Sequence, residues 1–120
     1  MSAKVGIVGC GNISETYLRN SRRLADIEVV AVSDIDKQRA QARADEYHIP
    51  KALSVAELLA EPEIDIVINL TIPKAHAEVG LAALEAGKSA YSEKPLAIQR
   101  EDARKILELA SAKRLRVGCA

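Results

Sequence analysis

The stretch that decides the fold is Lys4-Val5-Gly6-Ile7-Val8-Gly9-Cys10-Gly11-Asn12-Ile13-Ser14. It begins as an apolar run typical of a buried strand, and its glycines form a turn that opens a helix. Gly9 permits the tight turn, and Gly11 lets a pyrophosphate approach the backbone without a Cβ in the way. Ser14 replaces the third glycine of the G-x-G-x-x-G pattern, and serine is small enough to be tolerated there. Taken alone, the stretch would also suit an ordinary strand-to-helix turn that binds no ligand.

An acidic residue at the end of the next apolar run supports dinucleotide binding. Asp34 follows the run 28–33 and lies 23 positions after Gly11. A carboxylate at this point accepts hydrogen bonds from the adenosine ribose and repels a 2′-phosphate, so we expect NAD, with NADP less favoured. Lys37 and Arg39 follow closely and could soften that repulsion. The alternative is a solvated aspartate that starts a turn before a helix.

Strand-like and helix-like segments alternate along the whole chain. The pattern predicts strands at 4–8, 28–33, 51–53, 64–70, 89–92 and 116–118, and helices at 13–24, 36–47, 54–59, 75–86 and 100–113. Right-handed crossovers turn this order into a Rossmann-type, doubly wound α/β fold. We expect one domain over residues 1–120, with a mostly parallel open sheet of about six strands and helices on both faces.

The composition excludes several classes of protein. Hydrophobic residues are 48% and charged residues 28% of the 120 residues, as in globular chains. The 17 basic and 17 acidic residues cancel, so we expect no nucleic-acid partner. No apolar stretch approaches the roughly twenty residues of a membrane span, and we expect no membrane partner. No signal peptide is visible and the two cysteines form no disulfide framework, which favours the cytoplasm.

Two further segments carry groups that could do chemistry. Ser92-Glu93-Lys94-Pro95 follows the fifth expected strand, at the sheet edge where open α/β folds bind ligands. A lysine there could hydrogen-bond substrate hydroxyls or help remove a proton as hydride leaves, but a solvated turn would account for the same residues. His76 follows Pro73 near a helix start, and we favour a hydrogen-bonded structural role over a catalytic acid. Neither His48 nor His76 lies at metal-ligand spacing from a cysteine, so no metal site is expected.

Over its whole length the chain resembles the N-terminal NAD(P)-binding domain of the Gfo/Idh/MocA oxidoreductases. The motifs that carry the resemblance are Val5-Gly6-Ile7-Val8-Gly9-Cys10-Gly11-Asn12-Ile13, Asp34, Thr71-Ile72-Pro73 with His76, Ala86-Gly87-Lys88 and Glu93-Lys94-Pro95-Leu96-Ala97. The Glu-Lys-Pro segment is the family's hallmark. Ser14 departs from the family pattern, as does Lys74, which replaces the asparagine common after that proline.

The resemblance implies a role for each motif. The residues implied to bind the cofactor are Gly9, Gly11, Asn12, Ile13, Asp34, Leu70, Thr71, Pro73, His76, Glu93 and Lys94. The first four would hold the pyrophosphate, and Asp34 the adenosine ribose. Leu70, Thr71 and Pro73 would line the groove with His76 beside it. Glu93 and Lys94 would lie near the nicotinamide and its ribose, and Lys94 would also be the catalytic residue that reaches substrate.

The implied function is that of an NAD-binding domain in an oxidoreductase. Hydride would pass between the nicotinamide and a sugar, polyol or related hydroxy compound. The family's C-terminal substrate and dimerisation domain is absent from residues 1–120, so we expect cofactor binding with little turnover. Substrate binding and homo-oligomerisation are expected of the intact protein. One alternative is a non-catalytic NAD-sensing or interaction module, which would not need Lys94. Another is a methyltransferase, against which Pro73 and the Glu-Lys-Pro segment speak.

Overall fold

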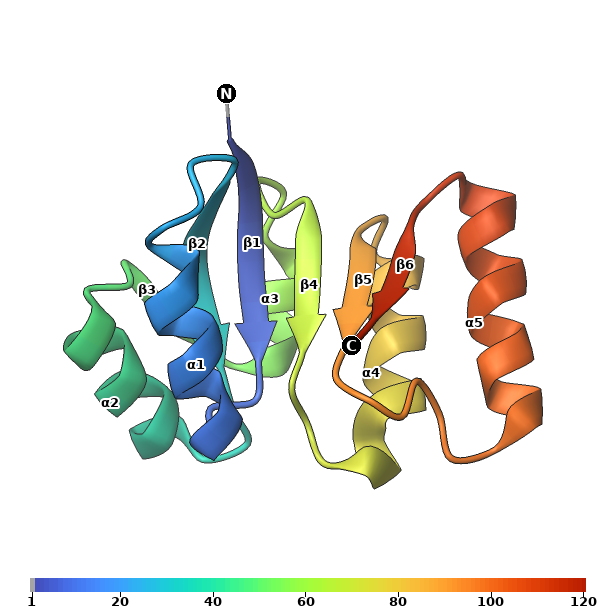
Figure 1. Ribbon diagram of the computed structural model, residues 1–120, viewed down its shortest axis with the longest axis horizontal. Coiled ribbons are helices and arrows are strands. Elements are labelled where there is room, and N and C mark those ends of the chain that lie inside the picture. The colour runs from blue at the N-terminus through green and yellow to red at the C-terminus, as the bar shows by residue number, and fades with distance from the viewer. Residues whose placement is uncertain (1) are drawn as a thin grey trace.

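Strands and helices alternate strictly in the computed structural model, which describes residues 2–120 (Figure 1). The strands are β1 (Ala3–Val8), β2 (Ile27–Ser33), β3 (Lys51–Leu53), β4 (Ile66–Asn69), β5 (Ser89–Ser92) and β6 (Val117–Cys119). The helices are α1 (Asn12–Ser21), α2 (Lys37–Tyr47), α3 (Val55–Ala60), α4 (Pro73–Glu85) and α5 (Arg100–Lys113). All neighbouring strands are parallel in the order β3-β2-β1-β4-β5-β6. The expected Rossmann-type fold is therefore confirmed, and its sheet is wholly parallel.

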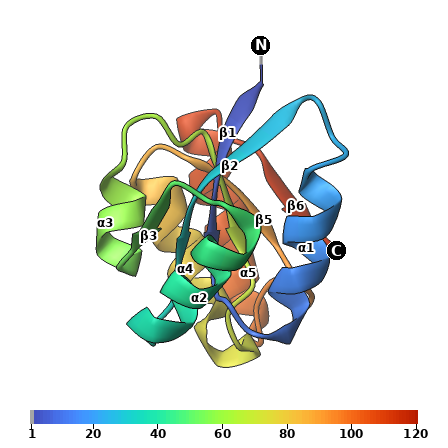
Figure 2. The same cartoon turned by 90° about the vertical axis from the view of Figure 1, so that its left-hand side faces the viewer.

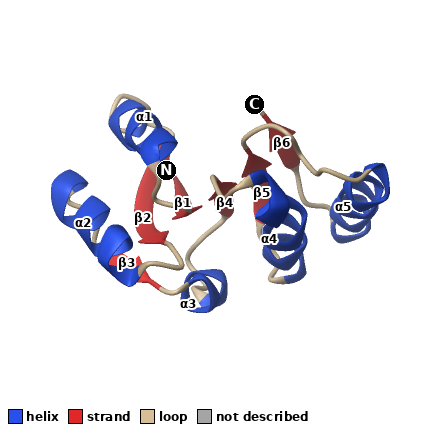
Figure 3. Cartoon of the chain, turned by 90° about the horizontal axis from the view of Figure 1, so that it is seen from below, coloured by secondary structure: helices blue, strands red, loops and turns tan. Residues whose placement is uncertain are grey.

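The helices cover the two faces of the sheet unequally. Helices α1 and α2 lie on one face, and α3, α4 and α5 lie on the other (Figures 2 and 3). Side chains alternate accordingly, since Val5 and Ile7 pack with α1 and α2 whereas Val8 packs in the other core cluster. On the α1 side, Ile66 and Ile68 of β4 are half-buried and Tyr91 of β5 is exposed. That part of the face carries no helix in residues 2–120 (Figure 3).

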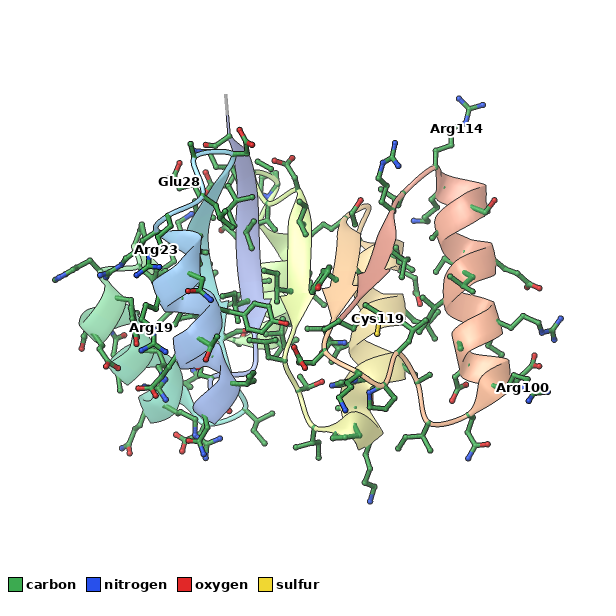
Figure 4. All side chains as sticks on the ribbon, viewed as in Figure 1. Arg19, Arg23, Glu28, Arg100, Arg114 and Cys119 are labelled. Atoms are coloured by element: carbon green, nitrogen blue, oxygen red, sulfur yellow. The ribbon has the colours of Figure 1, made fainter. Side chains whose placement is uncertain are left out.

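Because every strand runs the same way, all the strand ends that matter for ligand binding lie at one edge. The arrows of β1, β2, β4 and β5 point to the lower edge in Figure 1. The turns after these four strands therefore meet there. Charged side chains such as Arg100 and Arg114 extend instead into solvent at the two ends of α5 (Figure 4).

Local contacts fix the start of α3, the end of α4 and the turn before β4. Ser54 and Glu57 form the capping box that starts α3, each side chain accepting from the other's backbone N–H. Gly87 follows α4 with φ +84, the left-handed conformation that glycine adopts at helix ends. Lys88 after it is 4% exposed, and its Nζ donates to the carbonyl oxygens of Glu61 at 2.6 Å and Ile64 at 3.1 Å. This lysine therefore stabilises the turn between α3 and β4.

Three elements have a boundary that differs by two or more residues from the sequence prediction, and several other boundaries differ by one residue. Helix α1 ends at Ser21 rather than residue 24, and the chain continues in tighter turns, in which the N–H groups of Arg23 and Leu24 donate to the carbonyls three residues before them, at 3.0 and 3.1 Å. Strand β4 covers 66–69 rather than 64–70. Helix α4 begins at Pro73 rather than residue 75, because the first helical position needs no N–H and proline's fixed φ suits it.

Candidate functional site

The turn after β1 needs glycine at its first position for steric reasons. Gly9 has φ +106, and a Cβ added to it would lie 2.6 Å from the carbonyl oxygen of Leu70 and 2.7 Å from the carbonyl carbon. The Gly9 N–H donates to the carbonyl of Ser33 at 2.8 Å. The turn after β1 is therefore pressed between the ends of β2 and β4, where a side chain has no room.

The start of α1 is left without a side-chain cap. Gly11 is the N-cap residue and offers no side-chain acceptor, whereas Asp36 caps α2 through the N–H groups of Gln38 and Arg39. A Cβ on Gly11 would meet nothing within 4 Å, so the space in front of this helix is open. The first N–H groups of a helix have no partner within it, and together with the helix dipole they attract an anion. The arrangement fits a pyrophosphate on Asn12 and Ile13.

Ser14, the departure from the glycine pattern, lies beneath this turn. It is fully buried, and its hydroxyl donates to the carbonyl of Gly11 at 2.6 Å. The Ser14 N–H donates to the same oxygen at 3.1 Å. Serine therefore fills the place of the third glycine and fixes the turn from the inside, without obstructing the outer surface of the helix start.

Asp34 joins the turns after β1 and β2. Its carboxylate is almost buried, with Oδ2 accepting from the N–H of Cys10 at 2.8 Å and Oδ1 from the N–H of Asp36 at 3.0 Å. The exposed Arg39 places Nη1 3.7 Å from Oδ2. Each carboxylate oxygen can accept a second hydrogen bond, which leaves capacity for ribose hydroxyls. These acceptor oxygens fit the hydroxyl groups of the adenosine ribose of a dinucleotide.

A chain of hydrogen bonds supports the turn after β4. The Thr71 hydroxyl donates to Asn69 Oδ1 at 2.6 Å, and Asn69 Nδ2 donates to the carbonyl of His76 at 2.9 Å. The His76 ring is 1% exposed, with Nε2 2.6 Å from the carbonyl oxygen of Thr71 and Nδ1 2.5 Å from that of Pro95. The expected hydrogen-bonded His76 is present, and it lies behind the turn, tying it to the loop after β5. Leu70 is buried beside Gly9, and Pro73 is exposed at the start of α4.

Glu93, Lys94 and Pro95 form the loop after β5, which we call the Lys94 loop. The Glu93 N–H donates to the carbonyl of Asn69 at 3.1 Å, and its Oε2 accepts a hydrogen bond from the hydroxyl of Tyr17 on α1. Lys94 is exposed at the same edge of the sheet. Tyr17 is a residue that the sequence analysis missed. The only available signal was its helical spacing from Ile13, because its partner lies 76 positions away.

Burial changes the acid–base behaviour of two groups near the site. The pKa of Tyr17 is raised well above its usual range, mainly by burial and in addition by the hydrogen bond and negative charge of Glu93. Burial and the charge of Asp34 raise the pKa of the Cys10 thiol to about 12. Cys10 therefore stays a neutral thiol that fills space beside the Ser33 carbonyl, 3.4 Å from its Sγ.

Residues 2–120 contain neither a cluster of metal-binding side chains nor a helix that could span a membrane. No three His, Cys, Asp or Glu side chains in this range gather as a metal site would require. No helix in the same range combines the length and apolarity needed to cross a membrane.

The start of α1 is open after a glycine turn, and it lies beside a buried carboxylate at the end of the next strand. This combination defines a dinucleotide-binding Rossmann domain. The chain belongs to the GFO_IDH_MocA family, whose model, described as an oxidoreductase family with an NAD-binding Rossmann fold, matches residues 3–120. The resemblance seen in the motifs is thereby confirmed. Binding of a nicotinamide dinucleotide is the property that this family domain carries.

Relatives with similar sequences and structures agree with this membership. Inositol 2-dehydrogenase 3 of Saccharopolyspora erythraea is 38% identical over 114 residues, which cover 94% of the chain and 34% of that protein. An NAD-binding oxidoreductase from Klebsiella pneumoniae is 25% identical with TM-score 0.93, covering 99% of the chain and 34% of its own. Biliverdin reductase from Synechocystis, solved with biliverdin and NADP+, is 29% identical with TM-score 0.90, and the match covers 98% of the chain and 37% of the reductase. The chain spans about a third of the length of these relatives.

Proposed function

We propose that the chain is the NAD-binding domain of an oxidoreductase that transfers hydride between the nicotinamide and a sugar, polyol or related hydroxy compound. The observation that carries the proposal is the uncapped start of α1 beside the buried carboxylate of Asp34. Similarity to an inositol 2-dehydrogenase supports the substrate class.

The cofactor would lie along the edge in the order in which the strands lie in the sheet. The neighbouring strands β2 and β1 are followed by Asp34 and by the glycine turn, respectively. The next two strands in the sheet, β4 and β5, are followed by Leu70–Thr71 and by the Lys94 loop. The adenosine ribose would bind Asp34, and the pyrophosphate would bind the N–H groups that open α1. The nicotinamide would then reach Lys94. The path crosses from β1 to β4, where the strand order reverses, and open α/β sheets bind ligands at that point.

The charge of Asp34 favours NAD over NADP. Its carboxylate would repel a 2′-phosphate on the ribose it holds. Arg39 is half-exposed with Nη1 3.7 Å from Asp34 Oδ2, so it is placed to attract the same phosphate. Because Asp34 accepts two backbone hydrogen bonds that fix its orientation, we expect its repulsion to dominate.

Lys94 would contribute to the chemical step. The bound cofactor supplies the hydride donor or acceptor. The exposed ammonium group of Lys94 would donate a hydrogen bond to the reacting oxygen of the substrate and stabilise the charge that develops there. The relatives are about three times as long as the chain, so we assign the substrate pocket and the contacts of a homo-oligomer to a further domain of the intact protein. Two free cysteines fit a cytoplasmic location.

Calorimetry of the 120-residue chain with NADH and NADPH tests the proposal. We expect saturable binding of NADH and weaker binding of NADPH. Asp34→Ala should weaken NADH by about tenfold or more, because the ribose loses its charged acceptor. Arg39→Ala, the matched control, should leave NADH affinity nearly unchanged and weaken NADPH further. Tighter binding of NADPH than NADH by the wild-type chain would overturn the NAD assignment, and no saturable binding of either would overturn the function.

A further inference from the structure

Two side chains hold the Lys94 loop from opposite faces of the sheet. On the α4 side, His76 Nδ1 lies 2.5 Å from the carbonyl oxygen of Pro95. On the α1 side, the Tyr17 hydroxyl bonds the carboxylate of Glu93. Lys94 stands between these two contacts and is itself exposed. The backbone of Lys94 is therefore fixed by its neighbours and not by contacts of its own side chain.

We propose that Tyr17 is a positioning residue that acts through Glu93 on Lys94, and that it ties the nicotinamide end of the cofactor site to the helix that binds the pyrophosphate. This inference rests on the function proposed above. Tyr17 lies one helical turn after Ile13, whose N–H belongs to the open start of α1. The hydrogen bond to Glu93 thus joins the two ends of the cofactor path across the sheet.

The surroundings of Tyr17 make its hydroxyl a permanent donor. Its ring lines a groove of about 490 Å³ between α1 and the half-covered sheet face, together with Ile13, Leu24, Ile68 and Tyr91. Burial raises the pKa of Tyr17, so its hydroxyl stays protonated near neutral pH and remains able to donate to Glu93. Glu93 is anchored from its other side as well, because its N–H donates to the carbonyl of Asn69 at 3.1 Å. Loss of the hydroxyl would therefore free the side chain of Glu93 while the end of β5 stays in place.

The competing explanation is that the ring of Tyr17 only fills the groove. Phenylalanine would then replace it without effect on ligand binding, since the ring is retained and only the hydroxyl is lost. A hydrogen bond that positions the loop must instead alter binding at the nicotinamide end alone. NADH and ADP separate these cases, because ADP carries the adenosine ribose and the phosphates but no nicotinamide.

The test compares Tyr17→Phe with the wild-type 120-residue chain, titrating NADH by the fluorescence of its reduced nicotinamide and ADP by calorimetry. We expect Tyr17→Phe to bind NADH about three- to tenfold more weakly, with less fluorescence enhancement, and to bind ADP with unchanged affinity. Tyr91→Phe removes a hydroxyl from the same groove without touching Glu93, and it should change neither affinity.

Variants of Glu93 sharpen the test. Glu93→Gln keeps an oxygen acceptor for Tyr17 and should retain more NADH affinity than Glu93→Ala. In the Glu93→Ala background, Tyr17→Phe should have no further effect, as a double-mutant cycle requires of two residues acting through one bond. If Tyr17→Phe binds NADH with wild-type affinity, or loses NADH and ADP binding equally, the inference is overturned while the proposed function stands. If the wild-type chain binds neither ligand, the proposed function fails and the inference fails with it.

Discussion

The two glycines of the opening turn have different tasks, and replacing each by alanine should separate them. In Gly9→Ala, the new Cβ would lie 2.6 Å from the carbonyl oxygen of Leu70. That backbone cannot easily retreat, because the N–H of Leu70 is bonded to the carbonyl of Val8 at 2.8 Å. The φ of +106 adds strain for any L side chain, about 1–3 kcal/mol. Overpacking adds a similar amount, so we expect a total loss of about 2–6 kcal/mol.

Gly11→Ala should have the opposite profile. Its Cβ would meet nothing within 4 Å and its φ is −76, so the folded chain accepts it without strain. The loss of glycine as N-cap and the lower entropy of the unfolded chain roughly offset each other, leaving a net change within about 1 kcal/mol. The new methyl group would, however, occupy the space through which the pyrophosphate approaches, and NADH affinity should fall by about tenfold or more.

Thermal unfolding and NADH titration of both variants give the answer. Gly9→Ala should lower the unfolding midpoint by about 10–25 °C, on the usual scale for a domain of this size. Gly11→Ala should unfold close to the wild-type temperature and bind NADH about tenfold or more weakly. An unchanged midpoint for Gly9→Ala would refute the steric explanation of the turn. Wild-type NADH affinity in Gly11→Ala would refute the placement of the pyrophosphate.

Three further outcomes follow from buried polar groups. His76→Ala should lower the free energy of unfolding by about 2–4 kcal/mol, measured by urea denaturation, because a buried carbonyl oxygen loses the ring N–H that bonds it and a cavity remains. A loss below about 1 kcal/mol would contradict the bridging role. Lys88→Met keeps the aliphatic stem but should lower the free energy of unfolding by about 1–3 kcal/mol in the same assay. Lys74→Met, at an exposed position, is the control and should change it by less than about 0.5 kcal/mol. Equal effects of the two substitutions would refute the stabilising role of the buried Lys88 ammonium group. A chromogenic disulfide reagent at about pH 8 should modify the exposed Cys119 at once and Cys10 only after unfolding. Burial raises the pKa of the Cys10 thiol to about 12, so the thiol remains neutral until the pH approaches that value. Rapid modification of two thiols in the folded chain would contradict this expectation.

The sequence predicted what depends on local pattern or on general rules of chain topology. The apolar run 4–8 and the glycine turn are local signals, and each is present in the structure. The sheet class followed from the alternation of strands and helices with right-handed crossovers. The end of α1 was missed, because no glycine or proline near Ser21 marks where the helix gives way to the tighter turns at Arg23 and Leu24.

The contacts that hold the site together could not be predicted from local patterns. Tyr17 and Glu93 are 76 positions apart, and neither carries a spacing that indicates the other. The acceptors of Lys88 are backbone carbonyls, which every residue possesses, so the sequence around it shows no partner. The position of His76 was expected, but its bond to Pro95 requires the loop after β5 to lie against the start of α4. Such contacts arise from the packing of the finished sheet.

The uncapped start of α1 would link the lifetime of this protein to the supply of its cofactor. With glycine at its N-cap, α1 is a few tenths of a kcal/mol less stable than it would be with a side-chain cap, and its first N–H groups are left for a dinucleotide to bind. A ligand at a hundredfold excess over its dissociation constant adds about 2.7 kcal/mol to the stability of the folded chain. In a cell, molecules without cofactor would therefore unfold more often and be degraded first. The amount of protein would then follow the size of the nicotinamide pool, through proteolysis and without any change in gene expression.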